Sequence, residues 1–62
     1  MAKQRILIVD SDQKTLRVLE ASLLKASYSV TTSLDGTDAL EKIRISPPDL
    51  IISEVVLPQM SG

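Results

Sequence analysis

Apolar runs alternate with amphipathic stretches along this chain, and that pattern predicts strands alternating with helices. Residues 5–9, "RILIV", form a short apolar run that stops at the acid cluster "DSD". Such a run without alternation is typical of a strand that is covered on both faces, as in parallel sheets. Residues 13–25 follow as an amphipathic helix. Its apolar stripe is expected to contain Leu16, Leu19 and Leu23, widened by Val18 and Leu24.

The second half of the chain repeats this alternation. Residues 28–32, "YSVTT", are rich in β-branched side chains and predict a second strand. After the turn signal "LDG", residues 37–45 place Ala39, Leu40 and Ile43 on one face of a second helix. The proline pair in "SPP" ends that helix, because proline lacks the backbone N–H. Residues 49–54 then supply a third strand.

The predicted element order is β-α-β-α-β, which implies a parallel sheet with right-handed crossovers. Ligands of such sheets bind at the carboxyl ends of the strands. Asp10, Ser11 and Asp12 follow the first strand, and Glu54 ends the third. These acids are therefore expected to meet at one edge of the sheet. Ser11 or Asp12 is also placed to cap the first helix.

Composition narrows the class of protein. The chain has 62 residues, no cysteine and a net charge of −1, with no basic run that favours nucleic acid. Its apolar runs fall far short of the roughly 18 residues that cross a bilayer, and no signal peptide is present, so a cytoplasmic protein is expected. A hydrophobic core this small seldom stabilises a fold by itself. An oxygen-ligated metal, self-association or further chain would supply the missing stability.

The motifs "ILIVDSD", "ASYSVTTSLDGTDALEKI", "PPDLII" and "LPQMSG" occur in this order. Together they resemble the N-terminal half of the receiver domain of two-component response regulators. The resemblance covers residues 1–62 and implies a flavodoxin-like, doubly wound parallel sheet, of which this chain holds only the β-α-β-α-β half. It also implies that the domain is incomplete and continues beyond residue 62.

The resemblance assigns roles to single positions. Asp10 matches the first of two acids that help to hold Mg²⁺, whereas Ser11 stands where the second acid is usual. Glu54 stands at the position of the aspartate that accepts a phosphoryl group from a kinase histidine. Val56 matches the residue whose backbone carbonyl joins the metal shell. The resemblance therefore implies a metal set of Asp10, Glu54 and Val56, weakened by the loss of one acid.

These substitutions predict a receiver-like module that is poorly phosphorylated, is not an enzyme beyond residual phosphoryl transfer and autodephosphorylation, and acts through protein contacts. Its partner is expected to be a sensor histidine kinase or a downstream protein, without direct binding to nucleic acid or membrane. An active Mg²⁺-dependent receiver that uses Glu54 as acceptor is the alternative, and a glutamate that mimics the phosphorylated state stays open. An unrelated α/β ligand-binding half is a third reading, although no glycine-rich loop follows the first strand. The unpaired third strand also leaves a homodimer open.

Overall fold

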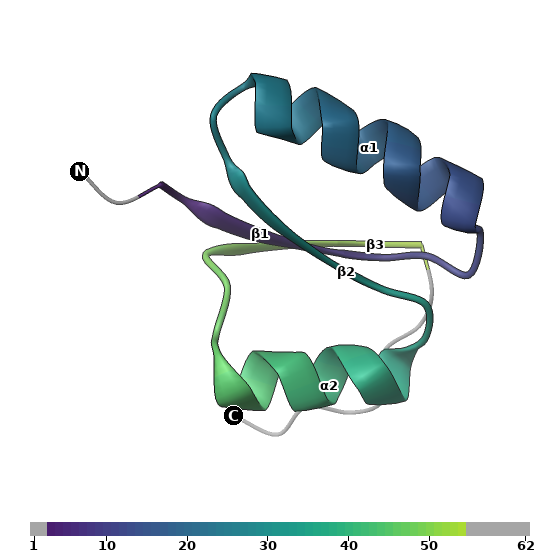
Figure 1. The fold of residues 1–62 in the computed structure, drawn as a ribbon. Coiled ribbons are helices and arrows are strands. Elements are labelled where there is room, and N and C mark those ends of the chain that lie inside the picture. The colour runs from purple at the N-terminus through teal and green to yellow at the C-terminus, as the bar shows by residue number, and fades with distance from the viewer. Residues whose placement is uncertain (1–2, 55–62) are drawn as a thin grey trace.

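Residues 3–54 form a three-stranded parallel sheet with one helix on each face (Figure 1). This computed structural model describes residues 3–54. The elements in chain order are β1 (Arg5–Val9), α1 (Gln13–Lys25), β2 (Ser29–Ser33), α2 (Gly36–Ile45) and β3 (Leu50–Ser53). The strands lie in the order β2-β1-β3, so the first strand is central. The predicted fold class, a β-α-β-α-β half of a doubly wound sheet, is confirmed.

The central strand forms the core because alternate side chains point to opposite faces of the sheet. Ile6 and Ile8 pack with Leu16 of α1 on one face. Leu7 and Val9 pack with Ala39 of α2 on the other face. All four of these β1 side chains are buried. This explains why the run carries no polar alternation.

Helix α1 is closed by a specific backbone or side-chain feature at each end. Asp12 caps the start, since its Oδ1 accepts a hydrogen bond of 3.0 Å from the Lys14 backbone N–H. At the other end Ser27 has a φ of 71°, a left-handed conformation that closes the helix. The Tyr28 N–H then donates to the Leu23 carbonyl at 3.1 Å. Both side chains pack against the core on the α1 face, which turns the chain into β2.

Several expected boundaries and contacts were wrong. The second strand runs over Ser29–Ser33 because it pairs with Arg5–Val9 residue by residue, and the third is shorter than expected at both ends. The second helix begins at Gly36, directly after its cap Asp35. Val18 and Leu24 do not widen the buried stripe, because they are 65% and 52% exposed. Only one face of α1 meets the sheet.

Candidate functional site: a carboxyl pair at the end of the sheet

Asp10 lies at the carboxyl end of the central strand and is held by the backbone around it. Its N–H donates to the Ser33 carbonyl at 3.1 Å, so β2 fixes its backbone. Its Oδ1 accepts from the Asp12 N–H at 2.9 Å. The side chain is only 4% exposed, and its buried Oδ2 has no hydrogen-bond partner among the described residues. A buried carboxylate oxygen without a donor is costly, so Oδ2 favours a bound cation.

Glu54 brings a second carboxyl to this place. It directly follows β3, and its N–H donates to the Val9 carbonyl at 3.2 Å. Once protonated, Glu54 can donate a hydrogen bond to the Asp10 carboxyl, which raises the pKa of Glu54, and the negative charge of Asp10 raises it further. Partial loss of solvent and the charge of Asp12 add smaller effects in the same direction. The structure thus brings Asp10 and Glu54 together.

Asp12, the other acid after β1, is not part of this pair. Asp12 is engaged with the start of α1, where its Oδ2 accepts a hydrogen bond of 3.1 Å from the Thr15 hydroxyl. Within residues 3–54, no group of three or more acidic, histidine or cysteine side chains is placed to hold a metal ion. Val56 lies outside the described residues. The described donors for a cation are therefore two carboxyls.

Two carboxyls fit the chemistry of Mg²⁺, which binds oxygen ligands and is often held by one or two carboxylates with water. The buried Oδ2 of Asp10 is the observation that favours a cation here, because nothing else described satisfies it. Asp10 and Glu54 are the residues that would hold the ion. A bound cation would also neutralise the repulsion between the two negative charges.

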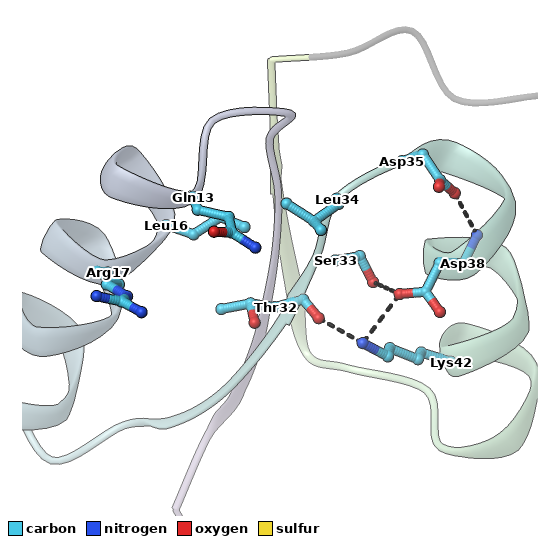
Figure 2. A pocket seen from close by; sticks show the side chains of 9 residues that line it. All are labelled: Gln13, Leu16, Arg17, Thr32, Ser33, Leu34, Asp35, Asp38 and Lys42. Atoms are coloured by element: carbon cyan, nitrogen blue, oxygen red, sulfur yellow. Dashed lines mark hydrogen bonds and ion pairs between the residues drawn. The ribbon is translucent and has the colours of Figure 1, made fainter.

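A second polar cluster lies beside the β2 edge and was not expected from the sequence (Figure 2). Asp38 Oδ2 accepts a hydrogen bond of 2.8 Å from the Ser33 hydroxyl and forms an ion pair of 2.9 Å with Lys42. The Lys42 ammonium also donates to the Thr32 carbonyl at 2.5 Å. The cluster borders a hollow of about 490 Å³ between α1, β2 and α2. The spacing of Asp38 and Lys42 was its one sequence signal.

Comparison with known proteins identifies the family. The sequence model of the response regulator receiver domain matches residues 6–62. This chain belongs to that family. The receiver chain is 37% identical to the alkaline phosphatase synthesis transcriptional regulatory protein PhoP of Bacillus subtilis, over 95% of this chain and 25% of that protein. It is 41% identical to the response regulator PleD of Caulobacter vibrioides, over 94% of this chain and 13% of PleD.

A plant relative gives the same picture. The two-component response regulator ARR10 of Arabidopsis thaliana is 43% identical over 94% of this receiver chain and 11% of its own length. The chain therefore spans a quarter or less of these relatives.

Receiver domains are signalling modules, generally not enzymes, that interact with histidine kinases and effector domains and usually bind Mg²⁺ at the phosphorylation site. Among residues 3–54, no helix is long and apolar enough to cross a membrane.

Proposed function

We propose that this chain is a receiver-like signalling module that is not phosphorylated at a useful rate and acts through protein–protein contacts. The observation that carries the proposal is the carboxyl pair itself. Glu54 stands at the end of β3, where the family places its acceptor aspartate, and Ser11 stands in place of the second acid. The remaining pair, Asp10 and Glu54, supplies two carboxyls where the family supplies three.

The longer side chain of Glu54 displaces the acceptor oxygen. Glutamate exceeds aspartate by one methylene, a displacement of about 1.5 Å. Phosphoryl transfer depends mainly on positioning and on neutralising charge. A misplacement of about 1 Å costs on the order of 100-fold in rate. The attack of Glu54 on a phosphodonor is therefore expected to be slow even when Mg²⁺ is present.

The loss of the acid at position 11 weakens the cation site. Ser11 contributes a neutral hydroxyl, so the charge available to hold Mg²⁺ comes from Asp10 and Glu54. The raised pKa of Glu54 works in the same direction, because protons compete with the metal for this carboxyl. Weak Mg²⁺ binding further lowers the rate of transfer, since the cation neutralises the charge that develops.

The test is incubation with a small phosphodonor and Mg²⁺, followed by intact mass. We expect the unmodified mass to persist. A stoichiometric gain of one phosphoryl group that Glu54→Gln abolishes would establish the alternative, an active receiver that uses Glu54 as acceptor. Asp12→Asn is the matched control, because asparagine also caps a helix and leaves Asp10 and Glu54 in place.

We also propose that residues 1–62 form part of a receiver domain that continues beyond them. The matched relatives are several times longer than this chain. Leu50, the first residue of β3, is 54% exposed although its side chain is apolar. Size-exclusion chromatography with light scattering on the 62-residue chain tests this. We expect association or poor cooperativity of unfolding; a stable, cooperative monomer would contradict the proposal, and a discrete dimer would favour pairing between copies.

A further inference from the structure

Among residues 3–54, no strand pairs with the outer edge of β2, and only some backbone groups of β2 point toward that edge. The Ser29 N–H donates to the Gln4 carbonyl, and the Ser33 carbonyl accepts from the Asp10 N–H, so both residues face β1. Backbone groups of successive residues in a strand point to opposite sides. Val30 and Thr32 therefore direct their N–H and carbonyl groups away from β1. An edge of this kind is a template for pairing with another strand.

The Thr32 carbonyl on this edge is already occupied. The Lys42 ammonium donates to it at 2.5 Å, and Asp38 holds the ammonium at 2.9 Å (Figure 2). Asp38 is fixed in turn, because its carboxylate accepts from the Ser33 hydroxyl at 2.8 Å and its N–H donates to Asp35 Oδ1 at 2.7 Å. The lysine is thus held against the edge by β2 and by the first turn of α2.

Lys42 also borders two hollows near β2. It lines the hollow of about 490 Å³ and a second, more apolar one of about 180 Å³ that contains Thr31 and Ile43. A strand added to β2 would meet the Lys42 ammonium at the Thr32 carbonyl. The side chain of Lys42 is 40% exposed, so it presents its charge to anything that approaches.

We propose that Lys42 hinders a second copy of this chain from adding a strand at the outer edge of β2. Two copies would pair antiparallel across a two-fold axis through Thr31. Val30 of one copy would then exchange hydrogen bonds with Thr32 of the other, which needs both Thr32 carbonyls. In each copy the incoming N–H would have to share the Thr32 carbonyl oxygen with Lys42, and two ammonium groups would lie beside the axis, where like charges repel.

The absence of cysteine allows a clean test by disulfide cross-linking. Thr31→Cys places one thiol at the expected axis, where the facing residues of a non-hydrogen-bonded pair are close enough to bridge. In that background Lys42→Met keeps an unbranched side chain one atom shorter and removes the donor and the charge. Regaining two hydrogen bonds is expected to raise the rate of dimer formation about tenfold or more.

Three controls separate this local effect of Lys42 at the β2 edge from a general effect of charge. Lys42→Arg retains donor and charge and should cross-link at the parent rate. Lys25→Met removes a positive charge from the end of α1 and should also match the parent. The same Lys42→Met change with the thiol at Leu50→Cys, on the β3 edge, should leave cross-linking unchanged. A folded Lys42→Met protein that cross-links no faster than its parent overturns the proposal, as does an equal rise for Lys25→Met.

A measurement on the unaltered chain covers the case in which Lys42→Met does not fold. If Lys42 hinders pairing between copies along β2, hydrogen exchange at the Val30 and Thr32 amides does not slow as the protein concentration rises. Slowing of exchange at these two amides with concentration would show that copies pair along β2 despite Lys42, and would overturn the proposal.

Discussion

Glu54 is exposed and Asp38 is half-buried in the first turn of α2, and the pKa values of these two carboxyls shift in opposite directions. The Asp10 carboxyl raises the pKa of Glu54 above its ordinary 4.5, first through a hydrogen bond and then through its charge. For Asp38, hydrogen bonds from Lys42 and then from Ser33 lower the pKa below its ordinary 3.8. The direction of each pKa shift follows from the neighbours of the carboxyl, an acid beside Glu54 and a lysine beside Asp38.

This difference shows what each cluster still requires. The Asp38 cluster has its cation built in, because Lys42 lies one helical turn away, and its pairing is complete within the chain. The cluster of Asp10 and Glu54 contains acids only, and Asp10 Oδ2 has no described donor. Acids gathered without a cation are typical of ligand sites, whereas a closed ion pair is typical of structural support. We therefore expect binding chemistry at the carboxyl pair.

The largest expected effect comes from completing the acid cluster. Combining Ser11→Asp with Glu54→Asp supplies the absent acid and retracts the acceptor by one methylene. We expect Mg²⁺-dependent labelling by a small phosphodonor to be on the order of 100-fold faster than in the native chain. Intact mass against time measures it. Adding Asp10→Asn to this double variant should abolish the gain in rate. A folded double variant that labels no faster than the native chain would contradict this account.

A smaller effect is expected when the repulsion within the pair is removed. Asp10→Asn takes away the charge of Asp10 and the acid–acid hydrogen bond, so the pKa of Glu54 should fall toward its ordinary value. An NMR titration of the Glu54 side-chain carboxyl follows the change. Asp12→Asn is the control and should shift it less, because Asp12 is the weakest of the causes. An unchanged pKa in Asp10→Asn would mean that Asp10 is not the perturbing group.

The smallest expected effect is on the pH dependence of stability, where the two acids oppose each other. The folded pKa of Asp38 is lowered, so its contribution is present above about pH 3.8 and is lost as the pH falls through the folded value. The folded pKa of Glu54 is raised, so its contribution is present below about pH 4.5 and is lost as the pH rises through the folded value. Thermal unfolding across acidic pH measures both.

Two neutral variants separate these contributions. Asp38→Asn should flatten the loss of stability at the acid end of the pH range. Glu54→Gln should flatten the decline that begins above about pH 4.5. Identical pH profiles for the two variants would show that the carboxyls do not differ as described.

Elements with strong local signals could be predicted from the sequence. The first strand and first helix have the expected bounds, because the apolar run of β1 and the leucine spacing of α1 each fit one periodicity. The meeting of Asp10 and Glu54 follows from topology alone, since parallel strands end at the same edge. The roles assigned to Asp10, Glu54 and Val56 stay predictions.

Contacts that depend on how a helix lies on the sheet could not be predicted. Val18 and Leu24 are apolar, but their apolar character alone does not indicate that α1 meets the sheet along one narrow face. The bond from Lys42 to the Thr32 carbonyl depends on the placement of α2 beside β2, which no local pattern contains. The burial of Asp10 is likewise set by β2, through the Ser33 carbonyl that holds its backbone.

The turn from α1 into β2 gives the molecule a built-in optical probe. Tyr28 is the single aromatic residue of the chain, and it packs against the core where the helix ends and the strand begins. Tyrosine emission from this protein therefore has one origin. Loss of α1 from the sheet should alter that emission, so fluorescence can follow the undocking of one helix without a label.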